Sequence, residues 1–457
     1  MPRPSACGCS TDWWPTITRA DTFLPVTVRF AAVTEHFSAR AAIGLENGFD
    51  AQGQTIALDP SLGDEADGAR AWAALAEPSR GLEIDAREWP TDAAVAIATG
   101  AALRAWRMPK GAPTCLKPAL LVLCRAPEEA RRLWPRAAAA VAGNLFARAL
   151  VAEPANRLTP ANFVERMKAL AEEGLTVSVL GPQELERRGY GALSAVGRAA
   201  PTGPYLVTLE WKGAGQPIAF VGKGLCFDNG GISIKPALGM EAMRADMAGA
   251  AACAGAMLAL ALRGAAGAAV AVLAVAENAI GADAYRPGDV LISASGRSIQ
   301  VMDTDAEGRL ALADALHHAI TRHAPRAVVD IATLTGSIVT ALGHHRAGLF
   351  GNNPTLRDAL MTMGEVVGEY LWPMPIGTAH REDLNSDIAD ILQCAPAGRL
   401  LPDACHAAAF LKEFVGETAW AHLDIAGVET AEEDTPLAAK GAPTGFGARL
   451  LEGLVEG

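Results

Sequence analysis

Beyond about residue 150, short apolar runs alternate with longer segments in which apolar residues recur at helical spacing. The predicted strands are 176–180, 205–211, 217–221, 268–276, 327–334 and 421–425. The predicted helices are 161–173, 240–263, 308–323, 355–370 and 404–415. This alternation is typical of an α/β fold, with a mostly parallel central sheet flanked by helices.

The first third of the chain has a different pattern. It contains a predicted strand at 25–30, an apolar strand at 119–124 and a charged helix from Glu128, without a cluster of reactive side chains. We therefore predict a boundary near residue 140. A smaller α/β domain of unassigned role covers 1–140, and a catalytic domain covers 141–457.

One apolar stretch, 247–276, is long enough to raise the question of a membrane helix. It is rich in alanine and glycine and contains Arg263, and a central arginine costs about 2.5 to 3.5 kcal/mol on insertion scales. The sequence therefore favours a buried helix followed by a buried strand, with no membrane partner.

The overall charge changes the range of partners. The chain has 39 Lys and Arg residues against 51 Asp and Glu residues, a formal net charge of −12. A protein of this charge lacks a broad basic surface, which argues against nucleic acid as a partner. Eight cysteines are scattered through the chain, and residues 1–24 lack the apolar core of a signal peptide. We predict a cytoplasmic protein with reduced thiols.

Charged residues gather in three segments that follow predicted strands or begin helices. Lys223, Asp228 and Lys235 are expected in a glycine-rich loop, and Asp246 at the mouth of the apolar helix. Asp305, Glu307 and Arg309 are spaced to share one side of an extended segment. Singly, each has an ordinary structural explanation, but buried charges must be paired or bind metal, and together they indicate a functional site.

These segments resemble the leucyl aminopeptidase (cytosol aminopeptidase) family of dimetal exopeptidases. The matching runs are VGKGLCFDNGGISIKP, MRADMAGAAA, AENAIGADAYRPGDV, TDAEGRLALADAL, ATLTGSIVTALG and AHLDIAG. Weaker similarity begins near residue 147 and continues to TGFGARLL, roughly the last two thirds of the chain.

The resemblance implies a hydrolase that removes the N-terminal residue from small peptides with a free N-terminus. It implies two divalent metal ions, Zn²⁺ or Mn²⁺ with Mg²⁺ or Co²⁺ as alternatives, held by Lys223, Asp228, Asp246, Asp305 and Glu307. A lysine that binds a metal must be neutral, so Lys223 would need a lowered pKa.

The resemblance also assigns the remaining roles. Lys235 would stabilise the oxyanion, and Arg309 would anchor a bicarbonate that carries the proton. Met243 and the turn Thr333, Leu334, Thr335 and Gly336 would line the substrate pocket. A homo-hexamer of two stacked trimers is implied as well. His422 and Asp424, in a predicted buried strand, are interpreted as structural.

Two departures from the family pattern bear on specificity. Asp303 stands where the family usually has asparagine, and the segment 398–403 replaces a run of small residues. Hydrolysis of dipeptides or conjugates on the same site is therefore an alternative. A second alternative is a DNA-binding or assembly scaffold, for which Arg131, Arg132 and Arg136 offer a local basic patch.

Overall fold

The computed structural model describes residues 24, 26–31, 64–73, 82–87, 89–108, 119–396 and 402–455. The chain forms two compact units, Met1–Ala142 with Glu433–Ala442, and Gly143–Glu432 with Pro443–Gly457. The division falls inside helix α5 (Pro127–Ala152), which begins one residue before the charged helix predicted from Glu128. The division of roles between residues 1–140 and 141–457 stays a prediction.

The N-terminal unit contains a small parallel sheet, in the order β1-β3-β2, and two helices that pack closely together. Its elements are β1 (Thr27–Ala31), α3 (Asp64–Ala73), β2 (Leu82–Asp85), α4 (Thr91–Arg104) and β3 (Ala119–Leu123). A Cβ atom at Gly68 of α3 would lie 1.8 Å from the carbonyl oxygen of Ile97 in α4. Glycine is needed there because the two helix backbones touch.

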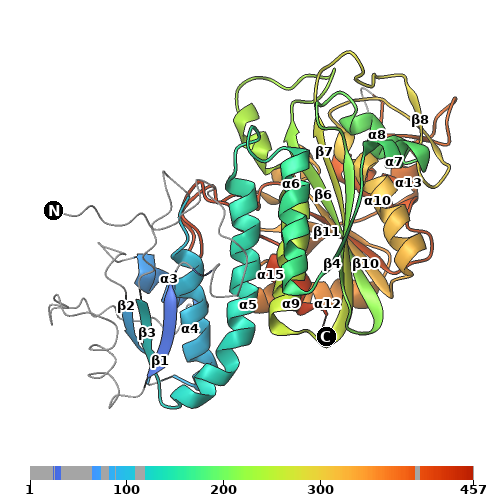
Figure 1. Ribbon diagram of the computed structural model, residues 1–457. Helices are drawn as coiled ribbons and strands as arrows, with labels where there is room; N and C mark the ends of the chain where they lie inside the picture. Colours follow the sequence, from blue (N-terminus) through green and yellow to red (C-terminus); the bar gives the residue numbers. More distant parts are fainter. Residues whose placement is uncertain are drawn as a thin grey trace, which may run out of the picture. The chain divides into compact units, whose positions relative to one another are not determined.

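The C-terminal unit is built on an eight-stranded sheet in the order β12-β11-β14-β10-β6-β7-β5-β4 (Figure 1). Its strands are β4 (Thr176–Leu180), β5 (Tyr205–Trp211), β6 (Ala214–Asp228), β7 (Gly267–Asn278), β10 (Ala327–Ala332), β11 (Ala347–Gly351), β12 (Leu371–Pro373) and β14 (Trp420–Asp424). The four central strands, β14, β10, β6 and β7, run parallel to one another. Antiparallel pairings occur further out, at β7 with β5, β5 with β4, and β14 with β11.

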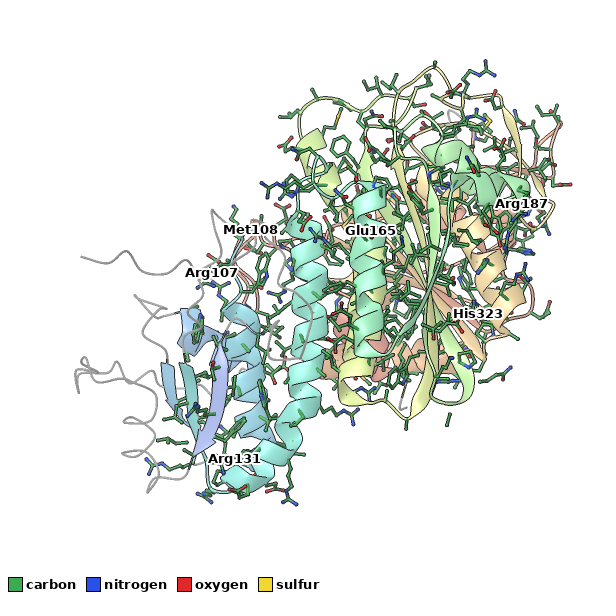
Figure 2. All side chains as sticks on the ribbon, viewed as in Figure 1. Arg107, Met108, Arg131, Glu165, Arg187 and His323 are labelled. Carbon is green, nitrogen blue, oxygen red and sulfur yellow. The ribbon has the colours of Figure 1, made fainter. Side chains whose placement is uncertain are left out.

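Helices cover both faces of this sheet. The longer helices and turns are α6 (Pro160–Ala169), η3 (Leu170–Glu173), η4 (Met240–Ala245), α9 (Ala248–Arg263), α10 (Glu307–His323), α12 (Pro354–Val367) and α14 (Asp403–Lys412). The shorter elements are α7 (Pro182–Arg187), α8 (Gly191–Gly197), α11 (Gly336–Leu342), α13 (Thr378–Glu382), α15 (Ala448–Gly453), β8 (Val290–Ile292), β9 (Ser298–Gln300) and β13 (Ile391–Leu392). Charged residues such as Glu165 and Arg187 lie on the outer helices (Figure 2).

Successive side chains of β6 point to opposite faces of the sheet, and a different helix packs on each face. Val221 belongs to the same buried cluster as Leu312 of α10, whereas Gly222 points the other way. A Cβ atom on Gly222 would lie 2.6 Å from the Cα atom of Ala250, so α9 rests directly against the strand backbone. Small residues in α9 and β6 therefore make this close packing possible.

The apolar stretch is a buried helix followed by a buried strand, as predicted. Among the described residues, one helical segment, 240–263, is long and apolar enough to cross a membrane, and 89% of its window is buried within the structure. The predicted single helix is wrong in detail. A 3₁₀ turn, η4, comes first, and α9 starts only after Asp246 and Met247.

Asp314 of α10 ties this helix to two neighbouring segments. Its two carboxylate oxygens accept backbone N–H groups of Ala294 (2.7 Å) and Leu193 (2.9 Å). Burial raises the pKa of Asp314 to about 7, above the unfolded value of about 3.9.

The raised pKa of Asp314 predicts a pH-dependent stability. A group whose pKa is raised on folding stabilises the folded state at low pH, and this contribution is lost as pH rises through about 7. We expect Asp314→Asn to reduce this fall in the unfolding free energy between about pH 4 and about pH 7. Urea unfolding of both proteins across the range tests this, and parallel curves would contradict it.

Candidate metal centre

The four parallel central strands of the sheet all end at one place. Asp228 and Asn278 are the last residues of β6 and β7 and are paired in register. Asp424 ends β14, paired with Ala332, the last residue of β10. In open α/β sheets, ligands bind outside the carboxyl ends of the strands, so this edge is the expected position of a site.

Lys223 lies within β6 rather than in the loop that we predicted, because the strand continues to Asp228. Its Nζ atom is 2.7 Å from Asp246 Oδ1, 2.9 Å from Glu307 Oε1 and 2.9 Å from the carbonyl oxygen of Thr333. The side chain is buried. One lysine thus joins carboxylates from the η4–α9 junction and from the start of α10.

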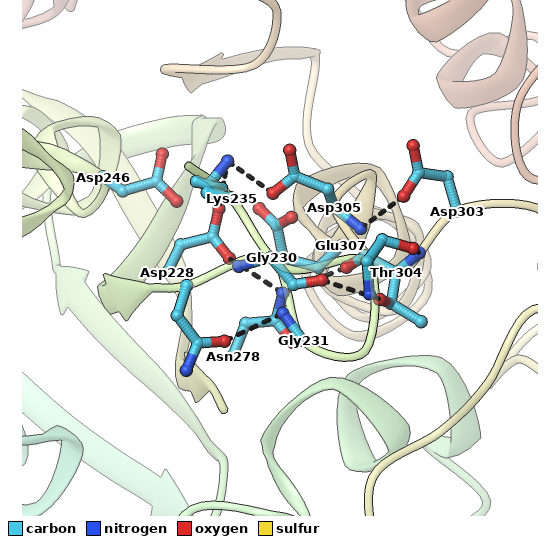
Figure 3. A network of polar contacts seen from close by, with 12 residues as sticks. Asp228, Gly230, Gly231, Lys235, Asp246, Asn278, Asp303, Thr304, Asp305 and Glu307 are labelled. Atoms are coloured by element: carbon cyan, nitrogen blue, oxygen red, sulfur yellow. Dashed lines mark hydrogen bonds and ion pairs between the residues drawn. The ribbon is translucent and has the colours of Figure 1, made fainter. Parts of the chain in front are cut away.

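A second lysine joins the other two carboxylates. The Nζ atom of Lys235 lies 2.8 Å from Asp228 Oδ2 and also forms an ion pair with Asp305 (Figure 3). Oxygen atoms of Asp228, Asp305 and Glu307 lie within 4.8 Å of one another. The structure therefore brings together all five predicted metal ligands and Lys235.

Loop backbones hold these carboxylates in place. Asp228 Oδ1 accepts hydrogen bonds from the side chain of Asn278 (2.8 Å) and from the backbone N–H of Gly230 (2.9 Å). Asp303 Oδ1 accepts the backbone N–H of Asp305 at 2.9 Å. An asparagine oxygen could accept the same bond, so the departure at position 303 preserves this contact.

Two glycines leave room for the charged side chains to approach the backbone closely. Gly230 has φ +87°, and a Cβ atom there would lie 3.0 Å from Asp305 Oδ1 and 2.4 Å from the carbonyl oxygen of Ser233. At Gly308, a Cβ atom would meet Lys223 Cε at 2.6 Å. Side chains at these positions would occupy space that the charged cluster needs.

The Gly308 contact predicts the cost of a methyl group. Overpacking costs about 1–3 kcal/mol, and the helix propensity of alanine returns about 1 kcal/mol. Because three contacts hold Lys223, we expect Gly308→Ala to lower the unfolding free energy by about 1 kcal/mol. Gly336→Ala, in α11 with open space around its Cβ position, is the matched control. Equal unfolding free energies for the two variants in chemical denaturation would refute the expectation.

The electrostatics follow from placing four carboxylates together, three of them buried and one, Asp305, half-buried. Burial and neighbouring carboxylates raise the pKa of Glu307 to about 8, and that of Asp305 to about 6. Burial likewise raises the pKa of Asp246 to about 6, although Lys223 opposes this shift. An additional positive charge would relieve the repulsion among these groups.

The surrounding carboxylates favour the charged form of Lys223, so the lowered pKa that metal binding requires would have to come from the cations themselves. Burial acts to lower its pKa, but the charges of Asp246 and Glu307 outweigh burial and raise the pKa above its ordinary value. A charged ammonium cannot bind a metal. A cation entering this cluster would have to displace the proton of Lys223.

The donor set fits a divalent cation. Asp246 Oδ2 and Glu307 Oε2 are buried without a hydrogen-bond partner among the described residues. Unpaired buried oxygens are costly, and metal coordination is one way to satisfy them. Carboxylates with one amine suit Zn²⁺, Mn²⁺, Mg²⁺ or Co²⁺.

The predicted substrate turn adjoins the cluster. The hydroxyl of Thr333 donates to Asp246 Oδ1 at 2.7 Å, next to the carbonyl that accepts Lys223. Met243 lies in η4, half-buried, three residues before Asp246. Both segments therefore connect directly to the predicted ligands.

Asp424 holds the same turn in place. Its Oδ1 accepts the backbone N–H of Leu334 (3.0 Å), and its Oδ2 accepts the hydroxyl of Thr335 (2.7 Å). His422, two residues earlier, contacts Asp330 Oδ1 at 2.5 Å in the buried strand pair. These contacts agree with the structural interpretation of both residues.

The spacing predicted an extended segment for Glu307 and Arg309, and this prediction is wrong. They occupy the first turn of α10, and Arg309 is buried against Asp403 and the backbone of Gln393.

Two residues of the site, Asn278 and Thr304, were not predicted from the sequence. Thr304 bridges two loops by donating to the carbonyl of Gly230 (2.6 Å) and accepting the backbone N–H of Ser233 (2.8 Å). A polar residue ending an apolar strand was the available signal for Asn278.

The buried carboxylates and the lysine that joins them form a site that suits divalent metal. A family model for the cytosol aminopeptidase family, catalytic domain, matches residues 145–452. The chain therefore belongs to the cytosol aminopeptidase family, as its motifs predicted.

Individual relatives agree with this assignment. The chain is 46% identical over 332 residues to a probable cytosol aminopeptidase of Brucella anthropi, covering 72% of this chain and 66% of that one. It is 44% identical over 376 residues to a probable cytosol aminopeptidase of Caulobacter vibrioides, covering 80% and 75%. The match spans just under two thirds of the Brucella protein.

A solved structure shares the fold. The bottromycin maturation enzyme BotP, in complex with Mn, is similar with a TM-score of 0.79 and 32% identity, covering 95% of this chain and 99% of that chain. The α/β architecture with a sheet flanked by helices is thus confirmed.

Proposed function

We propose that this protein is a metal-dependent aminopeptidase that removes the N-terminal residue from small peptides. The observation that carries the proposal is the convergence of Lys223, Asp228, Asp246, Asp305 and Glu307 on one point, from segments distant in sequence. Family membership supports the same reaction.

The five converging residues would hold two divalent ions, Zn²⁺ or Mn²⁺ with Mg²⁺ or Co²⁺ as alternatives. Bound there, such ions would lower the pKa of a water molecule and polarise the peptide carbonyl. Manganese is the metal in the BotP complex. This supports manganese as one metal to supply in the assay.

The remaining residues act on the substrate. Lys235 is only partly buried and reaches the cluster through Asp228 and Asp305, so its ammonium can donate to the carbonyl oxygen as negative charge develops. The turn from Thr333 to Gly336, together with Met243, would line the pocket for the first side chain. The positions of Thr333 and Met243 beside Asp246 support this placement.

A panel of aminoacyl amides tests the proposal, each with a free or an N-acetylated terminus, assayed after chelation and after Zn²⁺ or Mn²⁺ is restored. We expect cleavage of the free substrates alone, abolished by chelation and recovered with metal. Metal-independent cleavage, or equal cleavage of the acetylated substrates, would refute the proposal. Dipeptides in the same panel distinguish the alternative specificity raised by the 398–403 segment, of which 397–401 lie outside the described residues.

The cellular setting follows from the same proposal. The names of the relatives support a cytoplasmic enzyme. Five cysteines are free and buried among the described residues, while positions 7, 9 and 115 lie outside that set. We propose a hexamer of two trimers, for which light scattering should return six times the 47.4 kDa chain mass.

The scaffold alternative receives little support. Arg131, in the basic patch considered for DNA, pairs with Glu128 and donates to the carbonyl of Phe30 at 2.6 Å. The formal charge of −12 opposes a phosphate-binding surface. Salt-dependent retention of the chelated protein on DNA would be required to revive it.

A further inference from the structure

Arg309 is already paired with an anion that belongs to the chain. Its Nη2 atom donates to Asp403 Oδ1 at 2.9 Å, and its Nη1 atom donates to the carbonyl of Gln393 at 3.3 Å. The Arg309 side chain is 3% exposed, and its Nε–H is buried without a partner among the described residues. The carboxylate of Asp403 is therefore the anion that neutralises this buried cation.

Asp403 is also fixed next to the substrate turn. It is the first residue of α14, and the backbone N–H of Ala404 donates to Ser337 Oγ at 2.9 Å. Ser337 Oγ in turn lies 3.3 Å from Thr335 Oγ1, which Asp424 holds. These contacts join the first turn of α14, which carries Asp403, to Ser337 of α11 and through it to the substrate turn.

The side chain of Asp403 remains accessible. It is 32% exposed, while that of Arg309 is 3% exposed. Water can therefore reach the carboxylate but hardly the guanidinium behind it. A dissolved anion approaching Arg309 would meet the negative charge of Asp403 first, and two anions at one site repel each other.

We infer that Asp403 supplies, from within the chain, the carboxylate that Arg309 would otherwise take from solution as bicarbonate. Carboxylate and bicarbonate present the same kind of oxygen pair to a guanidinium, so they compete for one position. A side chain held by its own helix has a high effective concentration and wins this competition. The inference deepens the proposed function and rests on it.

The proton balance is complete without a further reactant. The Asp403 carboxylate accepts one proton from water as the new C–O bond forms at the peptide carbonyl. It gives that proton to the peptide nitrogen as the C–N bond breaks. Water is divided between the two products, and Asp403 returns to its ionised form.

The test compares the wild type with Asp403→Ala while bicarbonate is added at constant ionic strength. In carbonate-free buffer, we expect the variant to lose about 10²–10⁴-fold in turnover, the usual contribution of a positioned proton carrier. Bicarbonate should restore part of this loss and leave wild-type turnover unchanged. Full turnover of the variant in carbonate-free buffer would overturn the inference.

Anion binding provides a readout that does not depend on hydrolysis. We expect bicarbonate to raise the unfolding temperature of Asp403→Ala, because the anion fills the vacated position on Arg309, and to leave that of the wild type unchanged. Equal rises in both proteins would overturn the inference. If neither protein cleaves any peptide, the proposed function fails, while this measurement still decides whether Asp403 occupies the anion position.

Two further variants complete the design. Asp403→Asn retains the shape of the side chain without its charge, so it should show the same loss in turnover even if Asp403→Ala folds poorly. Glu184→Gln is the matched control. Glu184 lies in the first turn of α7, its side chain is 34% exposed, and it pairs with Arg187 at 3.0 Å. We expect neither a turnover loss nor a bicarbonate effect for Glu184→Gln, and a response like that of Asp403→Asn would overturn the inference.

Discussion

Lys235→Ala should lose about 10²–10³-fold in kcat while keeping its bound metal, because removing one donor to a developing oxyanion costs this much. Lys235 contacts Asp228 and Asp305 through its ammonium, yet the carboxylates themselves remain in the variant. The loss should therefore appear in turnover, with little change in metal content. Steady-state kinetics and elemental analysis of the same preparation measure both quantities.

The control for Lys235→Ala is Lys168→Ala. Lys168 is exposed on α6 and pairs only with Glu165 among the contacts that the structure describes, at 2.8 Å. It should retain wild-type turnover. If Lys235→Ala matched that control in kcat, Lys235 would have no part in the reaction. If it lost its metal instead, Lys235 would be a ligand or a support for one.

Glu307→Ala should bind metal more weakly by more than about 100-fold, since loss of even an outer partner of a ligand costs 10–100-fold. Its carboxylate lies near those of Asp228 and Asp305, and Oε1 is 2.9 Å from Lys223 Nζ. Removing it takes away one proposed ligand and leaves Lys223 with one carboxylate fewer. Hydrolysis at limiting metal should fall in parallel, and Glu307→Gln should behave similarly because it cannot carry the charge.

A buried carboxylate elsewhere controls for simple loss of a buried ion pair. Glu452 is 6% exposed and pairs with Arg263 at the far end of α9. That helix has 16 residues, so Arg263 is about 24 Å from the end that follows Asp246. Glu452→Ala should cost stability yet keep its metal. Equal metal content in Glu307→Ala and Glu452→Ala, measured by elemental analysis, would remove Glu307 from the ligand set.

Much of the fold could be predicted because its strands are short apolar runs bounded by polar or glycine residues. The strands 176–180 and 205–211 begin and end where the pattern placed them. The pattern failed where a charged residue and glycines interrupt an apolar strand. We predicted that β6 ends at Val221, because Lys223 and the glycines beside it are not typical of a strand. The strand continues to Asp228. A buried lysine is tolerated in that strand because carboxylates from distant segments surround it.

The helix boundaries show a similar limit. A continuous apolar run predicted one helix from Met240, but the chain turns at Asp246 so that this carboxylate can reach Lys223. Local periodicity carries no information about such a turn, because the partner lies in another element. The extended segment predicted around Asp305 failed for the same reason.

The α/β class, the family and the set of charged residues that gather at one site could all be predicted from the sequence, since these depend on local periodicity and on motifs of residue types. Which of these charges meet is established by the folded structure alone. It paired Lys223 with Asp246 and Glu307, whose charges raise the pKa of that lysine, and placed Asp403 on Arg309. Electrostatic partners are set by distance in space, and distances between segments far apart in sequence exist only once the sheet has formed.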